Sequence, residues 1–462
     1  MIRKIFIIVV IAGVAAVFLA LFVLNFSNRA YYADSSADIV YYLALPLVLA
    51  LSILAALRLP EDWRMAVALC FAVVPFAFYG VEGWLMASGE TMGAAVPADT
   101  VHTGSDGRSK RQVILDLKRE KGEGYPVMRA KSLLMAGPGN TFVPELTVGG
   151  KPTLPFASAP DSLVVSCNEG EGWIVYRSDE NGFHNPPGAW ARANRVALLG
   201  DSFAHGSCVK SEDNIAAHLE KNYGPALNLG VGGFGPLSML ATLREYLPAQ
   251  RPPVVLWLYF EGNDLIEDLP FERRAPILMR YLDDPSFRQN LDKRRGDVRA
   301  TLRAFLDAKT VEAMNRVDDP AERWNDFWQL YRLRERLGLS DVGLGLVGGV
   351  GESEFALFRR VLEEARRTVE GWNGQLVFVF LPEAGRYFGG GRNAARETLR
   401  RRVLETARAL DLPVVDVHAA FAQAPDPRAL FPYPGAHYNP QGYRVAAQAI
   451  DAYLRELPAR LD

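Results

Sequence analysis

The stretch that decides the fold is RVALLGDSFAHG, residues 195–206. Its apolar run ends abruptly at Gly200, Asp201 and Ser202. These residue types are common in strand-to-helix turns, because Asp and Ser cap helices and glycine tolerates a tight backbone. They would equally suit a nucleophilic serine at the carboxyl end of a parallel strand, where open α/β sheets place their chemistry. The stretch alone leaves both interpretations open.

From Arg195 onward, strand-like runs alternate with helical patterns. The run VVLWLYF is almost entirely apolar, as expected of a parallel strand buried on both faces. We expect five strands, at 195–200, 226–230, 254–260, 375–381 and 412–417, with helices at 214–223, 236–246, 393–410 and 440–457 between or after them. Strands interleaved with helices predict an α/β fold with an open, doubly wound, five-stranded parallel sheet.

The chain is too long for one small domain, and its composition changes along its length. We expect a membrane anchor over 1–86, a linker over 87–110 that is small, polar and broken by Pro and Gly, an accessory segment of short strands and loops over 111–194, and the α/β domain over 195–462. Within that domain, 265–353 forms a largely helical insertion beside the end of the third strand. Such insertions serve as lids or binding surfaces, and a purely structural role is equally open.

Three uncharged apolar runs dominate the N-terminal region, at 5–24, 39–57 and 65–81. Each approaches the roughly 20 residues that cross a bilayer as a helix, which predicts three transmembrane helices. Buried core helices are the alternative, but the runs have no polar face. The first run could be a cleaved signal peptide, although it exceeds the usual ~7–15 apolar residues.

The basic residues beside these runs predict the orientation of the chain. Arg3 and Lys4 precede the first run, and Arg58 and Arg64 lie between the second and third, whereas the other short loop contains only Arg29. Positively charged loops stay in the cytoplasm. We therefore expect an anchor in the cytoplasmic (inner) membrane and an extracytoplasmic, periplasmic α/β domain, and the same result follows if the first run is cleaved.

Charge and motifs argue against several classes of partner. With 51 basic and 53 acidic residues the net charge is −2, so nothing suggests a nucleic-acid partner.

The pattern G-x-G-x-x-G occurs at 230–235 and again at 343–348, where no strand precedes it. A string that occurs twice carries little weight, and we expect no nucleotide cofactor. The histidines show no two-His zinc spacing, so we expect neither a metal nor any other cofactor.

Cys167 and Cys208 both lie in the region expected outside the cytoplasm. Two cysteines in an oxidising compartment are expected to pair. The bond would tie the segment before the first strand to the helix behind Ser202. Two free buried thiols remain the alternative.

Polar residues follow the strands of the predicted sheet. Ser202 follows the first strand, Gly233 the second and Asn263 the third, and His437 lies just before the last helix. Parallel strands present these ends at one edge of the sheet. Acyl transfer needs a nucleophile, a base and donors for an oxyanion. Ser202 and His437 would supply the first two, and the Ser202 and Gly233 N–H groups with the Asn263 side chain would form the oxyanion hole.

These residues occur in a pattern that resembles the SGNH, or GDSL, hydrolase superfamily. Its four blocks centre on Ser, Gly, Asn and His, found here as GDSF, NLGVGG, GND and the histidine before NPQGY. The resemblance covers about 195–262 and 373–457, and YRSDENGFHNP is similar to a segment of membrane-anchored bacterial members. It implies a flavodoxin-like three-layer α/β/α fold and cofactor-free hydrolysis or transfer of an ester of a carbohydrate, lipid or related compound.

One feature departs from the family pattern, which has an aspartate two or three residues before the histidine. Gly435 and Pro434 occupy those positions. The nearest carboxylates in the expected topology are Asp416 and Asp264, and a backbone carbonyl could equally hold the ring. We therefore predict a Ser202–His437 dyad that takes no carboxylate from residues 434–436.

The sequence thus favours a membrane-anchored serine esterase or O-acyltransferase that acts outside the cytoplasmic membrane. From the location and the family resemblance, its substrate would be an acylated polysaccharide or another envelope ester. The alternative is a non-catalytic glycan-binding or assembly protein that keeps the fold, suggested by the missing aspartate. A dinucleotide-binding protein is the third and weakest interpretation.

Overall fold

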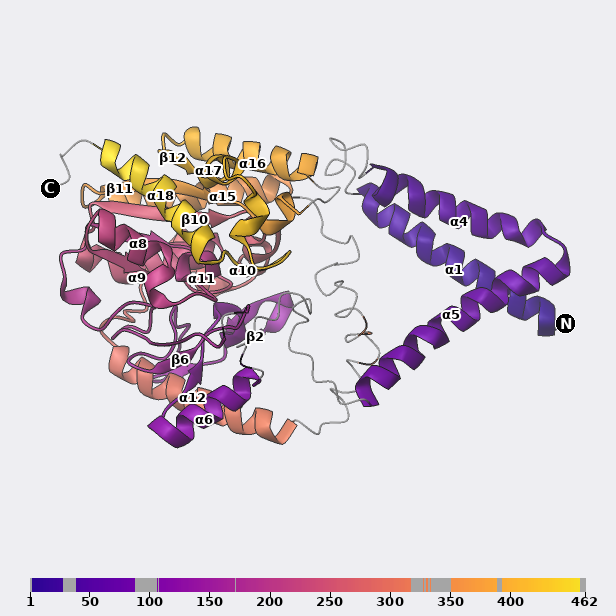
Figure 1. The fold of residues 1–462 in the computed structure, drawn as a ribbon, viewed down its shortest axis with the longest axis horizontal. Coiled ribbons are helices and arrows are strands. Elements are labelled where there is room, and N and C mark those ends of the chain that lie inside the picture. The colour runs from indigo at the N-terminus through magenta and orange to yellow at the C-terminus, as the bar shows by residue number, and fades with distance from the viewer. Residues whose placement is uncertain are drawn as a thin grey trace. The chain divides into compact units, whose positions relative to one another are not determined.

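Figure 1 shows the fold of the chain in a computed structural model. The structure describes residues 2–27, 39–87, 106, 108–170, 172–316, 327, 330, 333, 350–388 and 393–457. Most of the expected linker, and the second half of the expected insertion, lie outside these residues. The chain divides into two compact units, which are described separately. The smaller comprises Met1–Ala95, Asn315–Gly349 and Gly390–Thr398, and the larger comprises Val96–Met314, Val350–Gly389 and Leu399–Asp462.

The smaller unit contains apolar helices that pack side by side (Figure 1). They are α1 (Ile2–Ser27), a π-helical segment η1 (Ile39–Ala44), α4 (Leu45–Ala55), a 3-10 turn η2 (Ala56–Arg58) and α5 (Glu61–Ala87). Both α4 and α5 contact α1. Arg3 forms an ion pair with Asp62 at 2.9 Å, so the N-terminal ends of α1 and α5 lie together.

Among the described residues, two helices rather than the expected three are long and apolar enough to cross a membrane, Arg3–Ser27 and Glu61–Trp84. The expected helix over 39–57 is divided, and its apolar α-helical part, Leu45–Arg58, is shorter. Pro46 lies in the first turn of α4. Proline has no N–H to donate and crowds the carbonyl four residues earlier, so the helix changes its hydrogen bonding there.

The larger unit is built on a five-stranded parallel sheet, which confirms the predicted α/β class. Its strands are β8 (Val196–Leu199), β9 (Ala226–Asn228), β10 (Val254–Phe260), β11 (Gln375–Leu381) and β12 (Val414–Asp416). Their order is β12-β11-β10-β8-β9, and every neighbouring pair is parallel. This is the flavodoxin-like order, in which the chain changes direction between β8 and β10. Ligands of such sheets bind beyond the carboxyl ends of the strands at that switch point.

Helices cover both faces of this sheet. On one face lie α9 (Pro236–Gln250), α15 (Glu352–Glu370) and α16 (Asn393–Arg408), and on the other lie α8 (Ile215–Asn222), α17 (Val417–Ala422) and α18 (Pro440–Glu456). Strand β10 is buried throughout and alternates between the two cores: Trp257 and Tyr259 point to the first face, Leu256 and Leu258 to the second. The period of two along a strand thus serves two hydrophobic layers.

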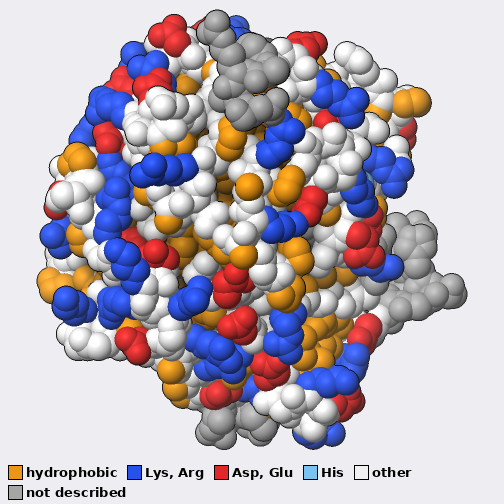
Figure 2. Space-filling view, turned by 90° about the vertical axis from the view of Figure 1, so that its left-hand side faces the viewer, with side chains coloured by type: hydrophobic (Ala, Val, Ile, Leu, Met, Phe, Trp, Pro, Cys, Tyr) orange, Lys and Arg blue, Asp and Glu red, His pale blue; other side chains and the backbone are white. Residues whose placement is uncertain are grey.

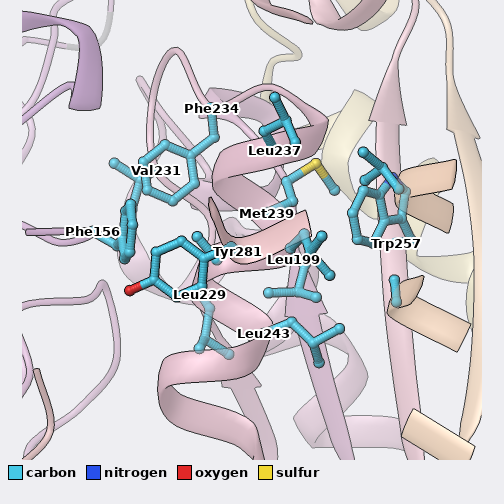
Figure 3. Packing of buried hydrophobic residues seen from close by; sticks show 14 of the residues in the cluster. Phe156, Leu199, Leu229, Val231, Phe234, Leu237, Met239, Leu243, Trp257 and Tyr281 are labelled. Carbon is cyan, nitrogen blue, oxygen red and sulfur yellow. The ribbon is translucent and has the colours of Figure 1, made fainter. Parts of the chain in front are cut away.

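The accessory segment shares the first of these cores. It contains α6 (Lys110–Lys121), a three-stranded sheet of β1 (Tyr125–Pro126), β6 (Leu163–Val165) and β7 (Val175–Arg177), and two hairpins, β2 (Leu134–Ala136) with β3 (Phe142–Pro144) and β4 (Thr147–Val148) with β5 (Lys151–Pro152). Phe156 is fully buried, and its ring meets Phe234 at 6.1 Å and Tyr281 at 5.7 Å between centroids (Figure 3). The segment and the sheet domain therefore form one hydrophobic core.

The described part of the insertion also packs into that core. After β10 the chain forms η8 (Asp264–Asp268), α10 (Leu269–Glu272), α11 (Pro276–Asp283) and α12 (Arg295–Arg316). Helix α11 packs on α9, and Leu278, Tyr281 and Leu302 are fully buried. These helices are therefore structural parts of the unit.

Basic and acidic side chains are interspersed on the face that Figure 2 shows. Several of the surface charges of the larger unit are paired, such as Arg299 with Asp161 and Arg360 with Asp283, both at 3.0 Å. This mixed surface agrees with the small net charge of −2.

Candidate active site

Ser202 is the first residue of a one-turn helix, α7 (Ser202–His205), directly after β8. The buried Asp201 caps this helix, because its Oδ1 accepts a hydrogen bond from the backbone N–H of Phe203 at 2.8 Å. The residues from Asp201 to Val209 are all buried except Ser202, which is partly exposed. The turn therefore presents one hydroxyl at the carboxyl edge of the sheet, as a nucleophile requires.

His437 lies within hydrogen-bond distance of that hydroxyl. Its Nε2 is 2.9 Å from the Ser202 Oγ. The residues that follow hold it in place: the fully buried Tyr438 donates its hydroxyl to the carbonyl of Pro382 at 2.7 Å, and Asn439 caps α18 by accepting from the N–H of Gly442 at 3.0 Å. A base at this distance can take the serine proton.

Glu169 holds the other side of the imidazole ring. Its Oε1 lies 2.7 Å from the His437 Nδ1, and its Oε2 accepts a hydrogen bond from the His437 backbone N–H at 2.9 Å. The side chains of His437 and Glu169 are 22% and 14% exposed, so the pair is largely shielded from water. A carboxylate in this position fixes the tautomer in which Nε2 can accept a proton. Sequence reasoning missed this residue.

A disulfide joins the Glu169 loop to the turn that carries Ser202. Cys167 and Cys208 are bonded at 2.02 Å, and their Cα atoms lie 5.1 Å apart. Cys167 precedes Glu169 by two residues, and Cys208 follows α7. The expected pairing of these cysteines was thus the one signal in the sequence that could have led to Glu169, since it brings residues 167–169 next to Ser202.

The two carboxylates suggested from the sequence lie elsewhere, which corrects that expectation. Asp416 forms an ion pair with Arg400 and accepts from the backbone N–H of His418 at 3.2 Å. It ends β12, an edge strand separated from β8 by β10 and β11. Asp264 is buried and accepts from the N–H of Phe260 at 3.1 Å, which closes the turn after β10. Neither contacts His437, and residues 434–436 supply no carboxylate.

The glycines after β9 run close beside the nucleophile. A Cβ on Gly230 would lie 2.2 Å from the backbone nitrogen of His205, so only glycine allows this close approach to α7. Gly233 has a φ of +76°, a conformation that glycine adopts without strain. A Cβ on Gly232 would lie 3.7 Å from the Cβ of Ser202. The structure therefore brings the loop that contains Gly233 next to Ser202.

Asn263 reaches the same edge from the end of β10. Its Nδ2 lies 3.5 Å from the Oδ2 of Asp201, the residue before the nucleophile. This contact is long, and an amide nitrogen carries a second hydrogen, so the side chain keeps a second N–H that can donate. The four residues expected from the motif blocks thus converge on one site.

A buried histidine pair supports the back of the turn that carries Ser202. The His205 Nε2 lies 2.9 Å from the hydroxyl of Tyr176 on β7, and the His184 Nδ1 lies 3.0 Å from the His205 carbonyl oxygen. Burial lowers the pKa of His184 to about 4 and lowers the pKa of His205 well below its ordinary value. Both rings are therefore neutral at pH 7, and they link the accessory segment to α7.

One set of donor atoms has the composition of a metal site. Atoms of Glu169, Cys208 and His437 all lie within 4.8 Å of one another. The Cys208 sulfur, however, is bonded to Cys167 and cannot act as a thiolate ligand. The remaining two groups are the hydrogen-bonded pair described above, so this donor set does not fit a metal ion.

The combination of a serine, a histidine and a glycine loop at the switch point of a parallel sheet agrees with the family comparison. The model of the GDSL-like lipase/acylhydrolase family matches residues 198–445, more than half of the chain. The chain belongs to this family. The resemblance noted in the sequence is therefore confirmed, whereas no curated protein matches the chain.

Several solved structures of lipases and lipolytic proteins are similar to part of this chain. A lipase/acylhydrolase from Enterococcus faecalis is 13% identical, with 57% of this chain and 95% of that chain covered and a TM-score of 0.32. A lipolytic G-D-S-L protein from Veillonella parvula is 11% identical, covering 57% and 98%, with a TM-score of 0.31. A GDSL-like lipase from Bacteroides thetaiotaomicron is also 11% identical, covering 58% and 90%, with a TM-score of 0.31. The family assignment rests on the family model.

Proposed function

We propose that this GDSL protein is a membrane-anchored serine esterase or O-acyltransferase. The observation that carries the proposal is the hydrogen-bonded series from the Ser202 Oγ to the His437 Nε2 at 2.9 Å and from the His437 Nδ1 to Glu169 at 2.7 Å. Nucleophile, base and orienting carboxylate are the three groups that serine-dependent acyl transfer requires.

In this proposal the Ser202 Oγ attacks the carbonyl carbon of the ester while His437 takes its proton. Glu169 accepts the Nδ1–H and stabilises the imidazolium that forms. The negative charge on the carbonyl oxygen is stabilised by the backbone N–H groups of Ser202 and Gly233 and by the Asn263 amide. As the tetrahedral intermediate collapses, His437 returns the proton to the leaving alcohol, and the acyl group remains on Ser202.

The second half of the reaction decides between hydrolysis and transfer. A water molecule or the hydroxyl of a second substrate loses its proton to His437 and attacks the acyl-serine. Release of Ser202 then gives a carboxylic acid or a new ester. The same residues serve both outcomes.

The anchor places this chemistry outside the cytoplasm in our proposal. The Arg3–Asp62 ion pair supports it, because α1 and α5 begin at the same end and so run in the same direction. The chain between α1 and α5 then has to cross the membrane in the opposite direction. In this proposal the helical segments η1, α4 and η2, from Ile39 to Arg58, make that crossing. Basic residues at this end favour the cytoplasm, which leaves the larger unit on the opposite side. An acylated envelope glycan is the substrate class that fits this location.

The non-catalytic alternative rested on the missing aspartate before His437. Glu169 occupies the position that such a carboxylate would take on the imidazole ring. No feature of the described residues therefore favours a binding protein over an enzyme.

The proposal is tested with the full chain in detergent. A fluorophosphonate probe should label the wild-type protein and the Ser286→Ala control, which changes an exposed serine, but should not label Ser202→Ala. The wild-type and Ser286→Ala proteins should also hydrolyse para-nitrophenyl acetate, whereas Ser202→Ala should not. A folded wild-type protein that shows neither labelling nor hydrolysis would contradict the proposed function.

A further inference from the structure

An arginine of the accessory segment lies beside the glycine loop that runs past Ser202. A Cβ built on Gly232 would lie 3.7 Å from the Ser202 Cβ and 3.9 Å from the Arg129 Cγ. A Cβ on Gly233 would lie 4.0 Å from the Arg129 Cβ. Arg129 therefore borders the glycine loop, and its side chain is exposed.

The backbone around Arg129 is fixed by several contacts. The N–H of the preceding residue, Met128, donates to the Ser158 Oγ at 3.1 Å, and the N–H of Ser132 donates to the Arg129 carbonyl at 3.0 Å. Lys131 forms an ion pair with the buried Asp268, just beyond the turn that carries Asn263. The position of Arg129 relative to the oxyanion donors is thus built into the fold.

A second cation, Lys110, is the first residue of α6. Its Nζ is 5.8 Å from the centre of the Trp173 ring. Trp173 donates its indole N–H to the carbonyl of Arg108 at 2.7 Å, and Asn168, the neighbour of Glu169, donates to the carbonyl of Asp106 at 3.1 Å. These bonds hold the start of α6 against the Glu169 loop.

Burial, together with the charge of Arg129, lowers the pKa of Lys110 to about 8. The charge of Lys110 also contributes to the lowered pKa of His205, the last residue of α7. Lys110 begins the helix that is held against the Glu169 loop, and it is still mainly protonated at pH 7.

Within the described part of the chain, neither cation has a carboxylate partner. Other cations of the same region do: Lys118 pairs with Asp307, Arg177 with Glu123, and Arg303 with Glu123 at 3.2 Å. Two neighbouring cations without a counter-ion repel one another, and a bound anion would remove that cost. An arginine is suited to a planar carboxylate or to a phosphate.

We propose that Arg129 and Lys110 form a subsite for an anionic group on the ester substrate. This inference rests on the proposed function and narrows its substrate class: the alcohol part of the ester carries a carboxylate or a phosphate near the acylated hydroxyl. An acidic sugar unit of an envelope glycan has this chemistry. The two cations act as specificity residues beside the catalytic residues.

The test compares esters that differ in charge. The substrates are para-acetoxybenzoate, para-acetoxyphenyl phosphate and the neutral para-acetoxybenzamide, and the readout is the ratio of kcat/KM for each anionic ester to that for the amide. The wild-type ratio should exceed one for the carboxylate, the phosphate or both. Arg129→Gln should lower it by about tenfold or more, the size of one charge-assisted hydrogen bond, and adding Lys110→Gln should lower it further.

A matched control removes the same two kinds of charge elsewhere. Lys151 on β5 and Arg444 on α18 are exposed, and the double variant Lys151→Gln/Arg444→Gln should keep the wild-type ratio. A wild-type ratio of one for both anionic esters, or an unchanged ratio in Arg129→Gln protein with an unchanged melting temperature, would overturn the proposal.

An inactive wild-type protein would contradict the proposed function. The anion subsite can then still be tested by a binding measurement. Saturation-transfer NMR on Ser202→Ala protein compares para-hydroxybenzoate with para-hydroxybenzamide. The anion site is supported if saturation is transferred to para-hydroxybenzoate but not to para-hydroxybenzamide, and if this transfer disappears in the Ser202→Ala/Arg129→Gln protein. Equal saturation transfer to both compounds, or transfer to neither compound, would refute the proposed anion site.

Discussion

Glu169 binds His437 twice, through the ring Nδ1 at 2.7 Å and through the backbone N–H at 2.9 Å, although 268 residues separate them in the chain. The carboxylate therefore fixes both the tautomer of the ring and the position of the backbone that carries it. In the usual family pattern a nearby aspartate precedes the histidine. Here the carboxylate comes from the segment before the first strand of the sheet.

Glu169→Gln should reduce kcat toward esters by about 10²–10⁴-fold, because an amide can stabilise the wrong tautomer of the ring and cannot neutralise the imidazolium. The melting temperature should change little, since the side chain keeps its shape. Steady-state hydrolysis of para-nitrophenyl acetate and thermal unfolding of the same preparations provide the two measurements.

Two variants serve as controls for that loss. Glu212→Gln removes an exposed carboxylate and should leave kcat unchanged. Asp416→Asn tests the carboxylate suggested from the sequence and should also retain activity. If Asp416→Asn abolished turnover and Glu169→Gln did not, the assignment of Glu169 would be wrong.

Removal of the Cys167–Cys208 bond should affect both stability and catalysis. The residues are 41 positions apart, and a loop of this size gives a stabilisation of roughly 4 kcal/mol in the chain-entropy model. Cys167→Ser/Cys208→Ser should therefore melt at a lower temperature, and it should also lose kcat, because Glu169 is released from its tether. The control is Cys70→Ser. Alkylation of both thiols in unreduced, unfolded wild-type protein would show that the bond does not form.

Asn263→Ala should lower kcat by about 10²–10³-fold, the usual cost of one oxyanion donor. KM and the melting temperature should change little, because the main contact of the side chain is the 3.5 Å approach to Asp201. Parallel measurements of turnover and unfolding separate the two roles. A collapse in stability would instead identify Asn263 as a residue that holds the turn after β10.

The fold and the four motif residues could be predicted from local sequence. The apolar runs from Val196 and Val254 are long enough to identify buried parallel strands, and the strand ends carry Ser202 and Asn263. The carboxylate could not be predicted in the same way, because apart from the nearby Cys167 nothing in the local sequence distinguishes Glu169 from a surface glutamate. Only the three-dimensional path of the disulfide brings it to His437.

The second apolar run, at 39–57, shows a different limit of sequence reasoning. Composition alone cannot tell a continuous α-helix from one whose hydrogen bonding changes at Pro46. The residues around that proline are Ile, Val, Tyr, Leu and Ala, and these residue types suit an α-helix and a π-helix alike. The loss of one N–H donor determines where the π-helical turn ends and α4 begins.

The buried His184 should make the larger unit sensitive to acid. Its pKa is about 4 in the folded protein and near 6.5 in the unfolded chain, so the unfolded state takes up the proton first as the pH falls. Its contribution to stability is thus complete above about pH 6.5 and is lost toward pH 4. At pH 5 the loss is about 2 kcal/mol, from 1.36 kcal/mol per pH unit.

The measurement is the free energy of unfolding of the wild type and His184→Gln at pH 8 and pH 5. The destabilisation caused by the substitution should be about 2 kcal/mol smaller at pH 5, because the variant has no imidazole to protonate. Buried carboxylates such as Asp179 contribute equally to both proteins and cancel. An identical difference at the two pH values would show that His184 is protonated equally in both states.

Reporter fusions test the orientation of the anchor. A reporter that is active only outside the cytoplasm should be active when fused after residue 95 and inactive when fused near Pro60, because basic residues retain the second site in the cytoplasm. The reverse pattern would place the candidate active site inside the cell.

The core that Phe156 shares with Phe234 and Tyr281 sets the minimal catalytic fragment. A recombinant protein trimmed to the family match at residue 198 would lose Glu169, half of the disulfide and the residues that cover α9. It would expose an apolar surface and aggregate, so a lack of activity in this fragment would not test the proposed function. Expression of the larger unit alone should therefore begin ahead of α6, because residues 106 and 108 already bond to Asn168 and Trp173.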